Sequence, residues 1–259
     1  PPFETLGLPP SVRDFAMAPF GLVLITGPAG SGKSTTLAAL IDHINHHRQG
    51  HVICLEDPIE YVHRHRRCTI EQIEIGEDAP SFAEALRNVF RQTPDVIMVG
   101  EMRDRETIAL ALTLAETGHL ILATLHTQDT ANAINRVVDT FPADQQEQIL
   151  MQLSMTLVGI CSQQLLITAD RRRRVLACEV LKANSAIRNL IREGAIQQIY
   201  SVLQIGRSEG MQTMEDSLWQ LHALGLITEE QALSRSGRPK EMLRMLQTKG
   251  RQGGREGGR

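Results

Sequence analysis

Residues 27–34 have the residue types and the spacing that bind a phosphate chain. Their pattern, G-x-x-x-x-G-K-S, lies between an apolar run, 22–25, and a helical pattern that begins at Lys33. In that context glycines let successive backbone N–H groups face inward, and the new helix adds the positive end of its dipole. Lys33 can then reach the β- and γ-phosphates, and Ser34 can bind Mg²⁺. The residues expected to contact the nucleotide are Gly27, Pro28, Ala29, Gly30, Ser31, Gly32, Lys33, Ser34 and Thr35.

Acidic side chains follow two of the expected strands, where the ligands of a parallel sheet bind. The run Glu56-Asp57-Pro58-Ile59-Glu60 ends the second expected strand, and Glu101 ends the third. Glu60 is the preferred general base for an attacking water, ahead of Glu56. We expect Glu101 to serve the Mg²⁺ site, directly or through water, or to polarise the attacking water. The alternative for the acids at 56–60 is a charged loop without a catalytic role.

Histidines and arginines provide further candidates. His119 and His126 bracket the fourth expected strand; His126 lies at the phosphate end, and His119 lies at the far end and is secondary. Phosphoryl transfer also needs a cation on the transferred oxygens. Arginines around the third strand could supply it, to this chain's nucleotide or to that of a neighbouring copy, although a surface salt bridge is the alternative for each. These arginines are Arg87, Arg91, Arg103 and Arg105.

The elements that would position these residues alternate along the chain. Short apolar strands are expected at 22–26, 52–56, 96–100 and 120–125, with helices between them. This alternation predicts an α/β fold with a central, mostly parallel sheet covered on both faces. A helix over 144–158 and a hairpin, 164–167 with 175–180, follow, and the pattern is helical from Asn184 onward. We therefore divide the chain into a linker (1–20), a nucleotide-binding domain (21–183), a small helical region (184–249) and a disordered tail (250–259).

The composition bounds the class of protein. The chain has 259 residues, 42% of them hydrophobic and 3% aromatic, with a net charge of −3. The sequence has no basic excess and few aromatic residues, so no nucleic-acid partner is expected. No apolar run is long enough to span a membrane. The four cysteines are far apart in the sequence and indicate free thiols in a reducing compartment.

Four segments, 27–36, 55–60, 95–104 and 117–127, occur in an order that resembles the Walker A motif, Asp box, Walker B motif and His box of the secretion ATPase superfamily. Within that superfamily the chain is most similar to the retraction ATPases of type IV pilus machines. Residues 186–194 match a signature of those proteins' C-terminal helices. The resemblance extends from about Leu6 to Leu246, which is nearly the whole chain.

The resemblance implies a RecA-like ATPase domain in a hexameric ring at the cytoplasmic face of the bacterial inner membrane. It implies ATP and Mg²⁺ as ligands, an inner-membrane platform protein as a partner, and hydrolysis that drives pilin disassembly. In this family's terms Glu60 is the catalytic glutamate and Glu101 the Walker B glutamate, while His119 and His126 form the His-box pair. Arg136 joins the arginines that could contact an interface or a phosphate.

Two departures from the family pattern leave alternatives open. The family carries an N-terminal PAS-like domain, so residues 1–20 are expected to be a linker from a missing domain. The extension and secretion branches usually carry a zinc-binding insertion with four cysteines, and its absence here favours retraction. A pilus-extension or secretion ATPase of the same superfamily remains the main alternative, and a P-loop helicase is less favoured. A regulatory module without turnover is disfavoured because Lys33, Glu60 and Glu101 are all present.

Overall fold

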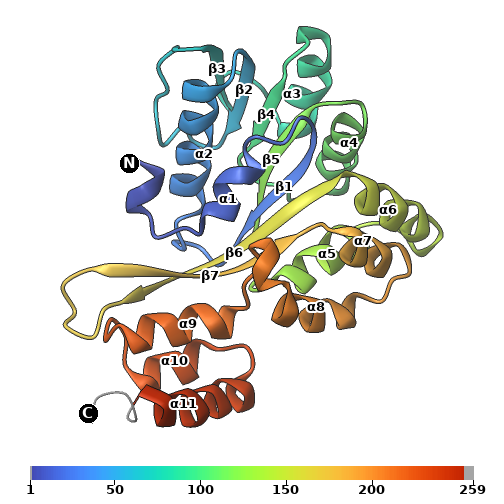
Figure 1. The fold of residues 1–259 in the computed structure, drawn as a ribbon. Helices are drawn as coiled ribbons and strands as arrows, with labels where there is room; N and C mark the ends of the chain where they lie inside the picture. The colour runs from blue at the N-terminus through green and yellow to red at the C-terminus, as the bar shows by residue number, and fades with distance from the viewer. Residues whose placement is uncertain (1, 254–259) are drawn as a thin grey trace.

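The structure, a computed structural model, describes residues 2–253, with residues 249–253 described by their backbone only. Within these residues the chain forms a seven-stranded sheet of order β3-β2-β4-β5-β1-β6-β7 (Figure 1). Neighbouring strands are parallel except for the pair β6 and β7, which form an antiparallel hairpin. The mostly parallel α/β sheet expected from the sequence is therefore confirmed. The strands are β1 (Gly21–Thr26), β2 (Gly50–Glu56), β3 (Cys68–Glu74), β4 (Val96–Val99), β5 (Leu120–Leu125), β6 (Leu157–Ile167) and β7 (Arg174–Lys182).

Helices cover both faces of the sheet, because the central strands carry apolar side chains on both faces. Residues of β1 alternate between the two cores: Leu22 and Leu24 pack in one, and Val23 and Ile25 in the other. The first core contains the helices α3 (Phe82–Val89), α4 (Arg105–Glu116), α5 (Thr130–Asp139), α6 (Ala143–Thr156), α7 (Ser185–Arg192) and α8 (Ile199–Ile205). The second contains α1 (Pro10–Phe15) and α2 (Lys33–His47).

The last three helices form a third, smaller core beneath the β6–β7 hairpin (Figure 1). They are α9 (Met214–Ala223), α10 (Glu229–Arg235) and α11 (Pro239–Gly253). Polar side chains cap helices in this half of the chain: Asn184 caps α7, and Thr228 begins α10 with a capping box. Helix α11 continues to Gly253, and residues 254–259 of the expected tail lie outside the described residues.

Three local expectations were wrong. Strand β3, at the edge of the sheet, was not expected, because its residues include few apolar side chains and follow a charged stretch. Helix α6 ends at Thr156, and the next strand begins at Leu157, although the sequence pattern extended the helix to Val158. The first strand of the expected hairpin, 164–167, is only the end of β6, which begins at Leu157. Helix α1, within the expected linker, begins at Pro10 after an N-cap at Pro9, because proline fits the first helical position.

The first residues of the chain pack onto the sheet. Phe3, Val12 and Phe15 are buried in the second core. A Cβ built on Gly159 of β6 would come within 2.3 Å of the Phe15 ring, so only glycine leaves room for that ring. The described residues of this segment therefore form part of the second core and do not only connect to β1. Among the described residues no helix combines the length and the apolar character that crossing a membrane requires.

Candidate active site

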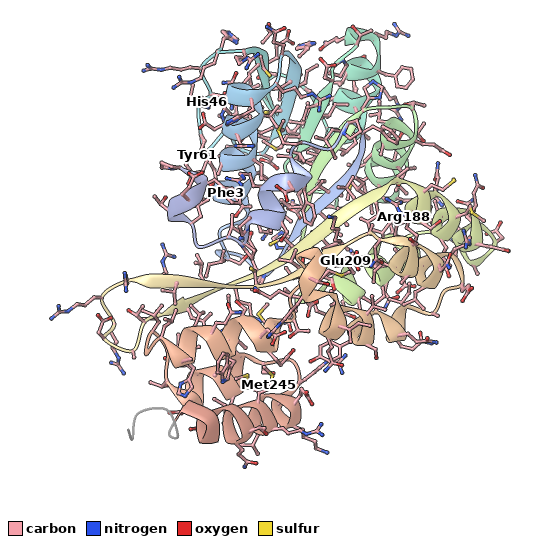
Figure 2. The ribbon with its side chains drawn as sticks, viewed as in Figure 1. Phe3, His46, Tyr61, Arg188, Glu209 and Met245 are labelled. Carbon is pink, nitrogen blue, oxygen red and sulfur yellow. The ribbon has the colours of Figure 1, made fainter. Side chains whose placement is uncertain are left out.

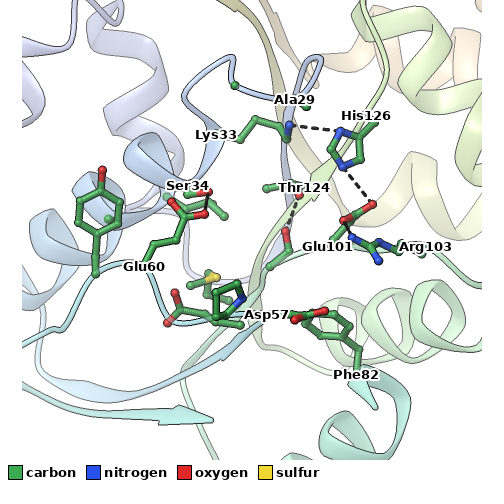
Figure 3. A pocket seen from close by; sticks show the side chains of 18 of the residues that line it. Ala29, Lys33, Ser34, Asp57, Glu60, Phe82, Glu101, Arg103, Thr124 and His126 are labelled. Atoms are coloured by element: carbon green, nitrogen blue, oxygen red, sulfur yellow. Dashed lines mark hydrogen bonds and ion pairs between the residues drawn. The ribbon is translucent and has the colours of Figure 1, made fainter. Parts of the chain in front are cut away.

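The candidate active site is a cavity at the carboxyl ends of β2, β4 and β5, against the N-terminus of α2 (Figure 3). Its volume is about 270 Å³. The sheet rule for ligand sites predicts this place, because parallel strands bring their carboxyl ends to one edge. The predicted site residues that line the cavity are Ala29, Gly30, Lys33, Ser34, Glu56, Glu60, Glu101, Arg103 and His126.

The loop between β1 and α2 has the backbone that phosphate binding requires. Gly27, Gly30 and Gly32 all have positive φ, at 142°, 73° and 91°. A Cβ on Gly27 would come within 2.3 Å of the carbonyl oxygen of Gln163, so this position has no room for a side chain. Helix α2 begins at Lys33 with no side-chain cap, which leaves its first N–H groups free for an anion.

Lys33 is buried, with 9% of the residue's surface exposed. Its ammonium donates to the carbonyl oxygens of Gly27 and Pro28, both at 3.0 Å. Burial lowers the pKa of Lys33, while Glu101 and Glu60 act in the opposite direction. A cation held by neutral carbonyls in a partly desolvated loop is suited to bind an anion, and the nucleotide phosphates fit this position.

Glu60 reaches the phosphate-binding loop from the loop that joins β2 to β3. The Ser34 hydroxyl donates to Glu60 Oε1 at 3.0 Å. The cavity is also lined by the Glu101 carboxylate, and hydroxyl and carboxylate oxygens are the ligands that Mg²⁺ prefers, so Ser34 and Glu101 have the chemistry to hold that ion. Glu56 also lines the cavity and is buried. Burial raises the pKa of Glu56, while the hydrogen bonds from Gln72 and from the backbone of Glu60 act in the opposite direction.

A continuous chain of polar contacts joins Lys33 to the carboxyl end of β4 (Figure 3). Lys33 Nζ lies 3.4 Å from His126 Nδ1, and His126 Nε2 lies 3.1 Å from Glu101 Oε1. An ammonium can only donate, so His126 Nδ1 accepts from Lys33, while His126 Nε2 faces Glu101. Arg103 binds the other oxygen of Glu101 at 2.6 Å.

The electrostatics of Glu101 keep it ionised. Burial by itself would raise the pKa of this carboxyl, but Arg103 and His126 outweigh burial and lower the pKa. The same ion pair raises the pKa of Arg103. Glu101 is therefore a carboxylate near neutral pH, which suits a metal ligand or a hydrogen-bond acceptor for water.

Several predicted residues lie elsewhere. His119 precedes β5 at the opposite end of that strand, and its ring contacts the Leu114 carbonyl and Phe90, so the structure does not bring it to the cavity. Thr35 contacts Tyr61, and Arg105 is the exposed first residue of α4. Arg87 pairs with Glu106, while Arg91 and Arg136 are exposed on other elements.

Sequence reasoning missed part of the cavity wall. Tyr61 and His63 follow Glu60 in the same loop, and Phe82, Met98 and Thr124 come from α3, β4 and β5. The position of Thr124 just before the end of β5 was a usable signal, since ligands bind at the carboxyl ends of parallel strands. Phe82 carried no such signal, because its place depends on how α3 packs beside β4.

Comparison with known proteins agrees with this geometry. Residues 9–258 match the family described as type II/IV secretion system protein. The chain belongs to this family. It is 51% identical over 92% of its length to a twitching motility protein of Neisseria gonorrhoeae. It is 48% identical over 92% of its length to the type IV pilus retraction ATPase PilT of Pseudomonas aeruginosa.

A solved relative supports the same assignment of the fold. The crystal structure of the pilus retraction motor PilT with bound ADP superposes with a TM-score of 0.90 at 52% identity, covering 95% of this chain and 69% of that one. The fold of this secretion-system protein is therefore RecA-like. The chain spans 64% of the Neisseria protein and 69% of the Pseudomonas protein.

Proposed function

We propose that this chain hydrolyses ATP and that the hydrolysis powers the retraction of a type IV pilus. The contact that carries the proposal is the one between Glu60 and Ser34, at 3.0 Å. It places a carboxylate directly at the start of the helix that would receive the phosphates. Two relatives are named as retraction proteins, which supports retraction as the direction of the motor. One of them was solved with ADP, which supports an adenine nucleotide as the ligand.

The residues divide the work of hydrolysis among them. The N–H groups of the loop 27–34 and the Lys33 ammonium bind the phosphate chain, and Lys33 exchanges its two carbonyl partners for phosphate oxygens. Glu60 accepts the proton of the attacking water. Ser34 and Glu101 would hold Mg²⁺, which supplies charge neutralisation on the phosphate oxygens when bound. His126 contacts both Lys33 and Glu101, so a displacement of either side chain would change the contacts of the imidazole.

The finer parts of the proposal concern assembly and place. We infer a homo-oligomer, a hexamer in its complete form, at the cytoplasmic face of the inner membrane, bound to the pilus platform protein. Arg103 is held by Glu101 in the structure. A neighbouring copy would therefore supply the cation that stabilises the transferred phosphate, as arginines do in other phosphoryl-transfer sites.

The test replaces Glu60 by glutamine, which keeps the size and the hydrogen-bonding oxygen but removes the basic carboxylate. We expect Glu60→Gln to bind MgATP with near-native affinity and to lower kcat by about 10²- to 10⁴-fold, the range for loss of a general base. Glu71→Gln is the matched control, because Glu71 is an exposed glutamate on β3 that pairs with His51 and does not line the cavity. Near-full turnover by Glu60→Gln would exclude Glu60 as the base.

A further inference from the structure

The segment 57–67, which we name the Glu60 loop, carries the proposed base and has no regular secondary structure. A loop of this kind holds a side chain in place only if other elements bind its backbone. The residues on either side of Glu60 are both bound in this way. The Ile59 N–H donates to Glu74 Oε2 at 3.0 Å, and the Tyr61 carbonyl accepts from Gln72 Nε2 at 2.8 Å.

The Gln72 amide makes two hydrogen bonds in addition to the one with the Tyr61 carbonyl. Its Nε2 group also donates to Glu56 Oε1 at 2.8 Å, and its Oε1 accepts from the His63 N–H at 2.9 Å. Only one orientation of the amide satisfies all three partners, because two of them are acceptors and one is a donor. Gln72 thus joins the end of β2, the middle of the Glu60 loop and β3.

The far side of the loop is bound to the phosphate-binding helix. The Tyr61 hydroxyl lies 2.9 Å from Thr35 Oγ1, next to Ser34 in the sequence, and Figure 2 shows Tyr61 beside α2. Tyr61 is therefore held at its ring by α2 and at its carbonyl by Gln72. Glu60, which precedes it, is brought to Ser34 by this pair of contacts.

We propose that Gln72 is a positioning residue for Glu60, acting through the Glu60 loop in the ATP hydrolysis proposed above. Gln72 does not line the cavity and contacts neither Ser34 nor Lys33. Its loss should therefore leave phosphate binding intact and displace the base. Since a displacement of about 1 Å in a catalytic group can cost on the order of 10²-fold in rate, the effect should be measurable in kcat.

The experiment measures kcat, the Kd for MgADP and the thermal unfolding midpoint of Gln72→Met, which keeps the length of the side chain and removes its amide. We expect kcat to fall by about 10- to 100-fold while Kd changes by less than about threefold. Gln204→Met makes the same chemical change at an exposed position on α8 and should keep kcat within about twofold. An unchanged kcat in Gln72→Met, or equal losses in kcat and in nucleotide affinity, would overturn the proposal.

A second variant covers the case in which Gln72→Met does not fold. Gln72→Glu keeps an acceptor for the His63 N–H, but it has no N–H donors and places a carboxylate beside Glu56. It should lower kcat at least as much as Gln72→Met. Native kcat in a folded Gln72→Glu chain would show that the two donated hydrogen bonds do not position the base.

A double-mutant cycle separates this inference from the proposed function. If Gln72 acts through Glu60, then adding Gln72→Met to Glu60→Gln should lower the residual single-turnover rate by less than about twofold. The same 10- to 100-fold loss in both backgrounds would place the effect of Gln72 elsewhere. If Glu60→Gln itself keeps near-full turnover, the proposed role of Glu60 fails, and the positioning role of Gln72 fails with it.

Discussion

Replacing Gly27 by alanine should cost far more stability than the same replacement at Gly30, although both glycines belong to the phosphate-binding loop. Gly30 has a φ of 73° and no atom within 4 Å of a built Cβ. Gly27 has a φ of 142°, and its built Cβ would lie 2.3 Å from Gln163 O and 2.5 Å from Ser31 Oγ. The two sites therefore present the same chemical change with and without a steric conflict.

The magnitudes follow from these two environments. Alanine in the left-handed region costs about 1–2 kcal/mol, and the reduced entropy of the unfolded chain returns about 0.4–1 kcal/mol. Gly30→Ala should therefore lower the free energy of unfolding by about 0–1.6 kcal/mol. At Gly27 a backbone region that is nearly exclusive to glycine costs about 1–3 kcal/mol, and overpacking adds about 1–3 kcal/mol. After the same entropic gain, Gly27→Ala should lower the free energy of unfolding by about 1–5.6 kcal/mol.

Urea unfolding followed by far-ultraviolet circular dichroism measures both variants against the native chain. Binding of a fluorescent ADP analogue at a urea concentration where the variants remain folded reports on the loop itself. Gly27→Ala should bind more weakly, because the loop must move away from β6 to admit the methyl group. Equal losses of stability in the two variants, or a larger loss in Gly30→Ala, would refute the steric reasoning.

Two further predictions concern packing away from the cavity. Arg188, labelled in Figure 2, donates from Nη1 to the Ser154 and Met155 carbonyl oxygens, at 2.6 Å and 2.9 Å, near the end of α6. Arg188→Ala should lower the free energy of unfolding by about 1.5–3 kcal/mol in urea titrations, and a loss below about 0.5 kcal/mol would contradict it. All four cysteines are buried: Cys54, Cys68, Cys161 and Cys178. Because they are buried, and burial raises the pKa of Cys54, a thiol reagent should label the native chain slowly and the urea-unfolded chain fast. Rapid labelling of the native chain would contradict this prediction.

The positions of the glycine-rich loop and of the acids after β2 and β4 could be predicted from the sequence, because they depend on local order. A strand, a glycine-rich turn and a helix follow one another within residues 21–47, so adjacent residues place one another. The carboxyl ends of parallel strands then fix Glu60 and Glu101 at one edge. The same rule separated His126, which lines the cavity, from His119, which does not.

The contacts that hold Glu60 could not be predicted, because they depend on pairing between strands. Strand β3 pairs with β2 in parallel register, and this pairing brings Gln72 level with Cys54 and beside the Glu60 loop. Without β3, Gln72 and Glu74 were only polar residues in a charged stretch. The sequence also predicted too short a strand for β6, 164–167, because Gly159, Ser162 and Gln163 weaken the apolar pattern of its first part.

The central claim is that this chain is an ATPase whose site is completed by a neighbouring copy. The most direct test is the rate of MgATP hydrolysis per chain as a function of protein concentration. Because Arg103 is held by Glu101, we expect the specific rate to rise with concentration and to reach a plateau as copies associate. A specific rate that stays constant at all concentrations would mean that each chain holds a complete site, and no hydrolysis at any concentration would contradict the proposed activity itself.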